Sequence, residues 1–477
     1  MNTAGKIISN STILMTADVA GRVMRFVLVI FAARLLGDVN YGKFAFAIAF
    51  TSLFLILADG GIHQLLVREL SRWPNKVKKY LGNALVIKFF LGAFTLIIIY
   101  LIANLTRKPQ DVLTTVYIIA FSQIVNSFSE FFKSVFQAFQ QMKYDAISTL
   151  IGGILTTGLG IGILVKGGDY ISLAWMYLIA NLVNLCFCVT ITFWVFTTIK
   201  FEVDLKLIKF FIKEGFPFGV LYFFAMMYTL IDTVMLSLMV GDEVVGWYNA
   251  AYRLVFAMLF IPMATMKAVF PVLSKYYKES VSNFKRLFEK TFKVMFVIGF
   301  SLAVLVFPLS NKIISFIYGE EYLNAANALR ILVWSTALIF ITTVMTHTTR
   351  ASNRQQFTAK VVASGALCNV VLNFILIPRY SYIGAALATL ATELFTFTFH
   401  YFYLWHNLVK PPLLKLAPRI IIINSVMLLY VISTMRVNIL FVIPTALLIN
   451  FIMALLIHYF SKEEIILLKD TVKALRS

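Results

Sequence analysis

The chain has 477 residues, of which 60% are hydrophobic and 13% are charged, and its mean hydropathy is +0.86. Soluble domains are nearer ~45–50% apolar and ~25% charged, and a soluble chain of this length would divide into several cores joined by polar linkers. The sequence has no such linker, and apolar blocks of about 20 residues recur, so a polytopic membrane protein is predicted. The net charge of +20 does not indicate a nucleic-acid partner, because the basic residues lie in short loops and form no basic domain.

The apolar windows predict an all-α protein with about 14 transmembrane helices. The predicted spans are residues 7–33, 42–64, 82–104, 112–138, 146–165, 171–198, 216–240, 245–272, 291–317, 325–348, 357–378, 382–406, 417–435 and 438–459. The first is too long for a cleavable signal, so we expect it to be retained. Most of the 42 Lys and Arg residues fall in loops on the side of the N-terminus. By the positive-inside rule this predicts a cell-membrane protein (inner or plasma membrane) with cytoplasmic N- and C-termini.

The first predicted span carries three charged residues on one helical face, within the stretch "DVAGRVMRF". Asp18, Arg22 and Arg25 are spaced i, i+4 and i+7. An ionisable residue deep in the bilayer costs about 2.5–3.5 kcal/mol, so each needs a partner or an aqueous cavity, and Asp18 can neutralise only one arginine. The surplus charge, joined by Arg253 and Lys267, predicts a cationic cavity for an anionic substrate, since guanidinium groups suit phosphate oxygens. Buried arginines with a structural role are the alternative.

Other ionisable residues also fall within predicted spans. Four acids are candidates for ion coupling or for charge pairing: Asp18, Asp59, Asp232 and Glu393. Asp232 is a candidate counter-charge for Arg253, as a structural pair or as a gating pair. Glu130 and Lys133 lie one helical turn apart and are expected to satisfy one another or a neighbour. Lys88 is expected to snorkel toward the inner surface.

The segment between the sixth and seventh predicted spans has an amphipathic pattern. In residues 203–213, Lys206, Lys209 and Lys213 share one face of a helix, and apolar residues lie largely opposite. The pattern predicts a helix lying on the cytoplasmic leaflet, with a solvated basic loop as the alternative.

An internal repeat relates two predicted outer loops. "GDVNYGKFAFA", which starts at Gly37, and "GDEVVGWYNAA", which starts at Gly241, match at five positions without a gap. The copies lie six helices apart on the same side, so unless the match is chance they predict two six-helix lobes related by a pseudo-two-fold axis along the membrane normal. The predicted organisation is an N-lobe (1–200), an amphipathic linker (201–215), a C-lobe (216–410), and two extra helices with a cytoplasmic tail (411–477).

No pattern in the sequence indicates enzyme chemistry. The five histidines are scattered, and no HExxH, GxSxG, Walker or Rossmann motif is present. The three cysteines match no metal-ligand or redox spacing. The predicted outer loops are too short to hold the acid and base groups of a membrane polymerase. We therefore expect a protein that is not an enzyme, with no catalytic residues, no bound metal and no cofactor.

Several short motifs follow one another in order along the chain. They are Asp59-Gly60-Gly61 with Arg68-Glu69, Gly215-Phe216-Pro217-Phe218-Gly219, Asp232 before "GDEVVGWYNAAYRL", Pro271, Tyr318-Gly319-Glu320-Glu321-Tyr322, and "NVVLNFILIPRYSYIGAALAT". In this order they resemble the polysaccharide flippases (O-antigen-type, for lipid-linked oligosaccharides) of the superfamily that also includes multidrug and toxic compound extrusion transporters. The resemblance covers the first twelve predicted spans and implies two lobes around a central cavity.

The resemblance also implies a function. It implies a flippase that moves polyprenyl-pyrophosphate-linked oligosaccharide from the inner to the outer leaflet by alternating access, for surface polysaccharide or glycan assembly. It implies that the pyrophosphate is bound by basic residues, here Arg22, Arg25, Arg253 and Lys267. The expected partners are this substrate, membrane lipids and, as candidates, a glycan polymerase or glycosyltransferases, and the chain is expected to be a monomer.

Two points remain open at the level of sequence. Transport could be coupled to protons, to sodium or to the membrane potential. The alternatives to a flippase are a multidrug or metabolite exporter of the same fold and, from a different class, a membrane glycan polymerase or ligase.

Overall fold

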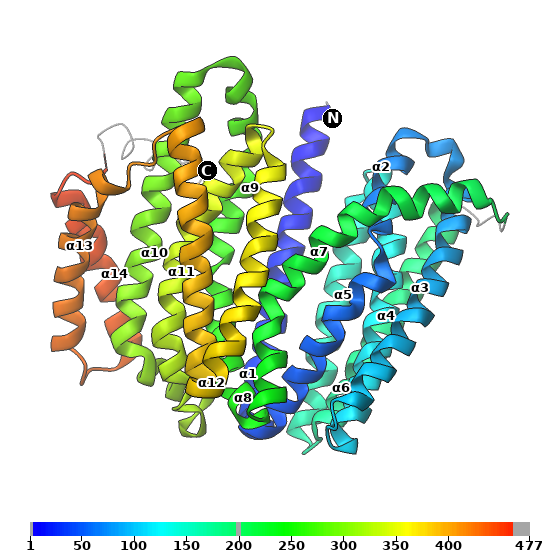
Figure 1. The fold of residues 1–477 in the computed structure, drawn as a ribbon, viewed down its shortest axis with the longest axis horizontal. Coiled ribbons are helices and arrows are strands. Elements are labelled where there is room, and N and C mark those ends of the chain that lie inside the picture. Colours follow the sequence, from blue (N-terminus) through cyan, green and yellow to red (C-terminus); the bar gives the residue numbers. More distant parts are fainter. Residues whose placement is uncertain (1–2, 197–201, 461–477) are drawn as a thin grey trace. The chain divides into compact units, whose positions relative to one another are not determined.

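The computed structural model describes residues 3–196 and 202–460, and every regular element in these ranges is helical. In chain order the helices are α1 (Thr3–Asp59), α2 (Ile62–Arg72), α3 (Val77–Leu105), α4 (Gln110–Ala138), α5 (Met142–Val165), α6 (Tyr170–Ile191), α7 (Leu205–Met239), α8 (Asp242–Met258), α9 (Phe260–Glu279), α10 (Val281–Tyr318), α11 (Ala325–Ala351), α12 (Gln355–Asn407), α13 (Leu413–Ser433) and α14 (Ile439–Leu456) (Figure 1). Within the described ranges, 12 helical stretches are long and apolar enough to cross a membrane. The predicted all-α membrane fold is confirmed.

Two of these helices are much longer than a bilayer requires, and each is broken once. α1 has 57 residues, about 85 Å at ~1.5 Å per residue, against a hydrocarbon core of ~30 Å. Its two helical segments meet at Gly37, whose φ of 73° is readily adopted only by glycine. The 53 residues of α12 are broken at Ser381, where φ is 55°. In both helices a pair of predicted spans lies on the two sides of the break, and the count of 14 crossings stays a prediction.

The chain divides into two compact units. Unit 1 comprises Met1–Ala250 and Ala366–Ala385, and unit 2 comprises Ala251–Gly365 and Ala386–Ser477. These boundaries differ from those of the predicted lobes, which rest on the sequence repeat and stay a prediction. In unit 1, the chain begins at the end where α2 lies, here called the inner end (Figure 1). The opposite end, where α8 begins, is called the outer end.

The first segment of α1 packs on α5 through small residues. Gly21 and Leu28 are buried, and a Cβ added to Gly153 or Gly160 of α5 would meet Met24 or Leu28. Small residues let two membrane helices approach closely, which raises their van der Waals contact. The charged residues of this segment lie beside the packed face and not within it.

At the inner end of unit 1, α7 begins earlier than the predicted seventh span. Asp204 caps the helix, because its Oδ1 accepts from the backbone N–H groups of Lys206 and Leu207 at 3.0 and 3.2 Å. The ion pair with Lys79, at 2.7 Å, holds the pKa of Asp204 below its usual value. Phe211 is fully buried, whereas the three lysines of the predicted amphipathic segment, Lys206, Lys209 and Lys213, are exposed. This part of the predicted linker is therefore the first section of α7, and residue 201 lies outside the described ranges.

Unit 2 is built around α10. Phe284, Phe288, Phe292 and Phe296 form a buried row along one side of this helix. A row of apolar side chains at spacings of four residues is the usual signature of a buried helix face. The row joins α10 to α9, α11 and α13.

Buried polar side chains join α10 to α13 and α14. The Ser301 hydroxyl lies 2.9 Å from Asn424 Oδ1 and 3.1 Å from Asn450 Oδ1, and Asn450 Nδ2 donates to Asn424 Oδ1 at 3.0 Å. All three side chains are buried. Hydrogen bonds between side chains of membrane helices hold them together where lipid is as apolar as the core. The last two helices are therefore tied into unit 2.

Replacing Asn424 by alanine should destabilise unit 2. The change leaves the Ser301 hydroxyl and the Asn450 amide buried without their shared acceptor, which we expect to cost about 1–2 kcal/mol. The measurement is the melting temperature of the purified protein in detergent. Asn104→Ala, which removes an exposed amide of α3, is the control, and equal melting temperatures for the two variants would contradict the role of Asn424.

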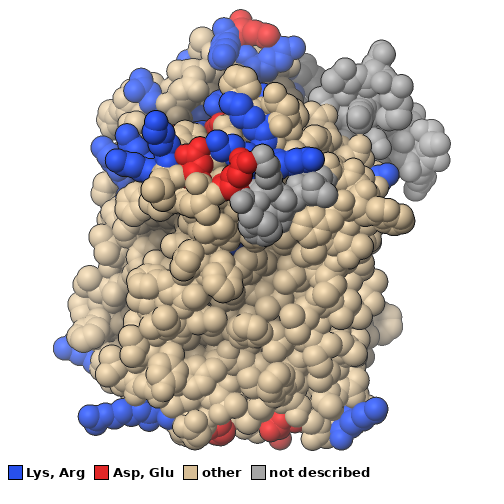
Figure 2. Space-filling model, turned by 90° about the vertical axis from the view of Figure 1, so that its right-hand side faces the viewer, with Lys and Arg blue, Asp and Glu red and all other residues tan. Residues whose placement is uncertain are grey.

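One face of the molecule has charged ends and an uncharged belt between them. Figure 2 shows Lys, Arg, Asp and Glu gathered at two ends of one face, with apolar and uncharged residues between them. On α3, which belongs to unit 1, Phe89 and Phe90 are 65% and 68% exposed. Large exposed apolar surfaces of this kind face lipid in membrane proteins. The chain is a multi-pass membrane protein.

Candidate functional site

The predicted pyrophosphate-binding arginines of α1 lie on an open face of the helix. Arg22 and Arg25 are exposed, whereas Gly21, which directly precedes Arg22, is buried. A Cβ built on Gly21 would lie 3.5 Å from Arg25 Nη1 and 3.4 Å from the Thr149 side chain of α5. The Arg25 guanidinium and Thr149 therefore flank the same glycine. Both arginine side chains are exposed on this face.

An ion cluster between α4 and α5 lies next to Thr149. Lys133 is nine-tenths buried, and its Nζ lies 2.9 Å from both Glu130 and Asp145 and 3.4 Å from the Thr149 hydroxyl. Gln137 also donates to Asp145, at 2.9 Å. The expectation that Glu130 and Lys133 satisfy one another is confirmed, and Asp145 completes the cluster.

Asp59, a candidate for ion coupling or charge pairing, has a buried lysine as its partner. The Nζ of Lys88 lies 3.0 Å from Asp59 Oδ1, and the Lys88 side chain is 0% exposed. The expectation that Lys88 snorkels to the inner surface is wrong. Its ammonium group is stabilised inside the unit by Asp59 and by the Ala58 carbonyl, at 3.4 Å, so it has no need to reach water.

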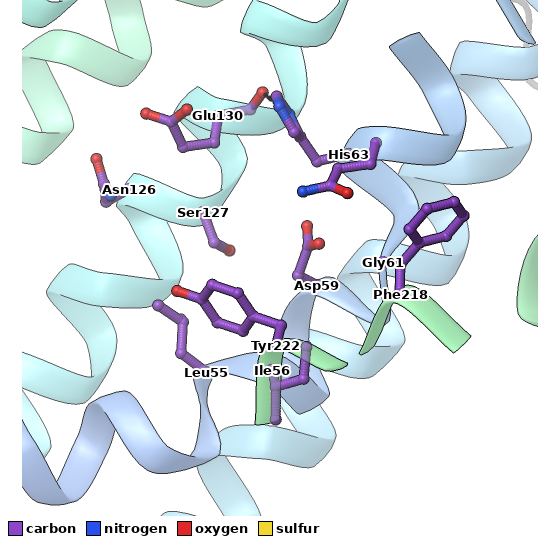
Figure 3. A pocket seen from close by; sticks show the side chains of 11 residues that line it. Leu55, Ile56, Asp59, Gly61, His63, Asn126, Ser127, Glu130, Phe218 and Tyr222 are labelled. Carbon is purple, nitrogen blue, oxygen red and sulfur yellow. Dashed lines mark hydrogen bonds between the residues drawn. The ribbon is translucent and has the colours of Figure 1, made fainter. Parts of the chain in front are cut away.

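A cavity of about 220 Å³ lies beside these ion pairs, between the end of α1, α2, α4 and α7 (Figure 3). We call it the α2 cavity. It is lined by Leu55, Ile56, Asp59, Gly61, His63, Gln64, Asn126, Ser127, Glu130, Phe218 and Tyr222. The His63 ring is fixed by its contact of 2.8 Å with the Glu130 carbonyl. A half-polar cavity of this kind at a helix break is a candidate binding site.

At the outer end, the two copies of the sequence repeat meet. A Cβ on Gly42 would collide with the carbonyl of Asp242, and a Cβ on Gly246 would collide with the carbonyl of Asp38. The contact is reciprocal, as expected where two copies of one motif pack about a pseudo-two-fold axis. Trp247 Nε1 adds a hydrogen bond to Asp38 Oδ2 at 2.8 Å.

Two lysines reinforce the outer end of unit 1. Lys108 donates to Asp242 and to the Ser237 carbonyl, both at 2.8 Å. Lys43 pairs with Asp111 at 2.9 Å, and the Tyr170 hydroxyl donates to the same carboxylate at 2.5 Å. Lys108 thus joins the loop between α3 and α4 to α7 and α8, and the contacts of Asp111 join α1, α4 and α6.

Asp232 lies in a second polar cluster of unit 1. Its side chain is 3% exposed and accepts from the Tyr248 hydroxyl at 2.5 Å and from Asn373 Nδ2 at 2.6 Å. Asn373 also donates to Asn369 at 3.0 Å. A phenol and an amide are thus among the partners of this carboxylate, and the pairing of Asp232 with Arg253 stays a prediction.

The remaining predicted residues belong to unit 2. Arg253 is half-buried, and its Nε has no hydrogen-bond partner among the described residues. Lys267 is exposed on α9. Glu393 is buried on α12, next to Thr396, whose hydroxyl donates to the Glu393 carbonyl at 3.0 Å. That these residues share a cavity with Arg22 and Arg25 stays a prediction.

Residues 7–277 match the model of a protein family described as "Polysaccharide biosynthesis protein". The chain belongs to the polysaccharide biosynthesis protein family. Residues 217–375 also match the family model MatE. The resemblance to polysaccharide flippases and their superfamily, predicted from the short motifs, is confirmed.

Relatives of this family member cover most of its length. CapF of Staphylococcus aureus, named a capsular polysaccharide biosynthesis protein, is 23% identical over 408 residues, which cover 83% of this chain and 99% of CapF. Agl15 of Haloferax volcanii, named a probable low-salt glycan biosynthesis flippase, is 22% identical over 405 residues, covering 82% of each chain. The solved structure of the lipid II flippase MurJ, in an inward closed conformation, is similar with a TM-score of 0.77 and 16% identity, covering 93% of this chain and 97% of MurJ. At this identity the likeness to MurJ shows the fold alone.

Several residues of this family member were missed by reasoning from sequence. Trp247 and Lys108 secure the outer end, and Phe218 and Tyr222 line the α2 cavity. One signal was available for Trp247, because it directly follows Gly246, the second glycine that the two copies of the repeat share. Nothing in the sequence indicates that α7 reaches the α2 cavity, since this depends on how the helices pack.

Proposed function

We propose that the protein is a flippase that moves polyprenyl-pyrophosphate-linked oligosaccharide from the cytoplasmic to the outer leaflet, for the assembly of a surface polysaccharide or glycan. The observation that carries the proposal is the exposed pair Arg22 and Arg25 in a membrane-spanning helix. The names of Agl15 and CapF, a flippase and a capsular polysaccharide biosynthesis protein, support it.

The arginines supply the recognition of the headgroup. Each guanidinium offers a planar pair of donors that fits two phosphate oxygens, and in a low-dielectric site such charge-assisted bonds are strong. Arg253 and Lys267 of unit 2 complete the anion site, while the prenyl tail stays in lipid. Binding neutralises the repulsion among the basic residues, which favours closing the cavity on one side and opening it on the other.

The return of the empty, positively charged cavity is favoured by an inside-negative potential, by about 2.3 kcal/mol per charge for each 100 mV. Asp59 is a candidate for charge pairing more than for ion coupling, because Lys88 already balances its charge. Asp232 is buried and accepts hydrogen bonds from Tyr248 and Asn373, and it stays a candidate for ion coupling or for charge pairing. Asp18 and Glu393 are further candidates.

Asp232→Asn should remove the dependence of transport on a proton or sodium gradient while leaving its dependence on membrane potential. Asparagine keeps the shape and one acceptor oxygen for Asn373, its amide N–H can donate to the Tyr248 hydroxyl, and the negative charge is lost. The measurement is the transport rate in liposomes with each gradient varied at fixed potential. The control is Asp169→Asn, since asparagine also caps α6. Unchanged gradient dependence in Asp232→Asn would assign coupling to another residue.

The proposal extends to partners and location. The protein is a transporter and not an enzyme, works as a monomer in the cell membrane with both termini in the cytoplasm, and delivers its substrate to a glycan polymerase or glycosyltransferases. Liposomes that contain the purified protein and a polyprenyl pyrophosphate with a short fluorescent oligosaccharide test the core of this proposal. Transfer between leaflets, read as fluorescence that an external quencher reaches, is the expected result.

The MatE match of residues 217–375 favours a second candidate function, export of drugs or metabolites. The same liposomes separate the two functions, because an exporter would move a cationic dye and leave the lipid-linked glycan in place. A glycan polymerase or ligase would instead lengthen or transfer the glycan.

A further inference from the structure

Each carboxylate of the α2 cavity already has an ammonium partner. Asp59 contacts Lys88 through Oδ1, and Glu130 contacts Lys133 through Oε1, which leaves the second oxygen of each carboxylate as a hydrogen-bond acceptor. In Figure 3, the Asp59 carboxylate points into the space between Gly61, His63 and Tyr222. The cavity therefore offers strong acceptors, and ammonium groups offset most of their negative charge.

Other polar groups of the cavity lack partners. Within the part of the chain that the structure describes, the Gln64 and Asn126 amides and the Tyr222 hydroxyl have no hydrogen bond to another residue. Each amide carries two N–H donors and one carbonyl acceptor. Phe218 and Tyr222, both on α7, add two aromatic rings to the lining, on the two sides of Asp59 (Figure 3). Acceptors, amides and aromatic rings thus line one small space.

This combination fits a sugar ring better than an ion. Sugar hydroxyls donate to carboxylate oxygens and accept from amide N–H groups, and the C–H face of the ring packs on aromatic side chains. A monovalent cation would find both carboxylates paired with ammonium groups, and 220 Å³ is many times the space that it needs. A phosphate would be repelled by the free carboxylate oxygens, so the pyrophosphate belongs elsewhere.

A continuous row of contacts joins the cavity to the arginine face. Glu130 lines the cavity and binds Lys133, which lies 3.4 Å from Thr149. Thr149 in turn lies beside Gly21 of α1, and the Arg25 guanidinium lies beside the same glycine. A headgroup on the arginines therefore has its next chemical group, a sugar, close to the cavity. We propose that the α2 cavity binds one sugar of the lipid-linked glycan while Arg22 and Arg25 hold the pyrophosphate, which rests on the proposed function.

Binding of two matched probes tests the proposal. The probes are polyprenyl pyrophosphate and the same lipid carrying one glucose, galactose, N-acetylglucosamine or N-acetylgalactosamine, and the measurement is Kd for the full chain in lipid nanodiscs. We expect at least one sugar to tighten binding about 10-fold. Asn126→Ala and Gln64→Ala should each weaken the binding of that lipid about 5-fold, the effect of one hydrogen bond, and leave the Kd of the bare lipid unchanged.

Two controls accompany these variants. Asn104→Ala removes an exposed amide of the same unit and should leave both Kd values unchanged. Arg22→Ala should weaken both lipids by the same factor. Tyr222→Phe removes a single hydroxyl of the cavity. It takes the place of an alanine variant that fails to fold.

Three results would overturn the proposal. If no sugar tightens binding, or if the cavity variants weaken both lipids equally, the cavity does not bind a sugar, although the flippase proposal stands. Loss of sodium binding in Asn126→Ala, with unchanged Kd for the sugar-bearing lipid, would assign the cavity to a cation. Failure of the wild type to bind either lipid would overturn the proposed function itself.

Discussion

Replacing both Arg22 and Arg25 by alanine should reduce the flipping of polyprenyl-pyrophosphate-linked glycan more than about 100-fold, without loss of membrane insertion. Each arginine contributes charge-assisted hydrogen bonds worth about 1.5–3 kcal/mol, so the loss of two leaves little affinity for pyrophosphate. Folding should be preserved, because both side chains are exposed and the packed face of α1 is formed by small and apolar residues such as Gly21 and Leu28.

Two control variants sharpen this experiment. In Arg22→Lys, Arg25→Lys the charge remains but the planar donor pair is lost, so transport should fall to an intermediate rate. Arg34→Ala removes an exposed arginine further along the same helix and should transport like the wild type. Wild-type transport by the double alanine variant would contradict pyrophosphate binding by the arginines and would favour a structural role for them.

The helices were predictable because apolar windows of about 20 residues have a direct physical cause in the thickness of the bilayer. The break of α1 at Gly37 was also predictable, since the first copy of the repeat begins at this glycine. In contrast, α8 ends at Met258 and α9 begins at Phe260, inside a stretch that reads as one apolar span. Pro262 is the local signal of this interruption, because proline has no N–H to donate to the Met258 carbonyl and is tolerated in the first turn of a helix.

The site was predictable only in part. The charged face of Asp18, Arg22 and Arg25 follows from helical spacing alone, and the structure leaves both arginines exposed. The partner of Lys88 could not be inferred, because Asp59 is 29 residues away and meets it only when α1 packs on α3. Pairings between helices depend on helix rotation and depth, which the apolar pattern of each helix does not specify.

Substituting leucine for Gly42 or Gly246 should separate two segments at the outer end, the part of α1 that follows its break at Gly37 and the start of α8. A Cβ at either position would collide with a backbone carbonyl, and a backbone cannot move aside as a side chain can. The reciprocal contact with Asp38 and Asp242, including the Trp247 hydrogen bond, would then be lost. Because alternating access requires the outer end to close as well as to open, we expect transport to fall more than about 10-fold.

The distance between two spin labels measures this separation directly. Labels at Val39→Cys and Glu243→Cys, both exposed and next to the contact, would be placed in a chain whose three cysteines are replaced. The distance between the labels should lengthen in Gly42→Leu and in Gly246→Leu, since either leucine side chain would push the two backbones apart. Gly158→Leu is the matched control, because a Cβ there meets nothing within 4 Å. If the two leucine variants keep the wild-type distance and transport rate, the contact between the two repeats does not determine how the outer end closes.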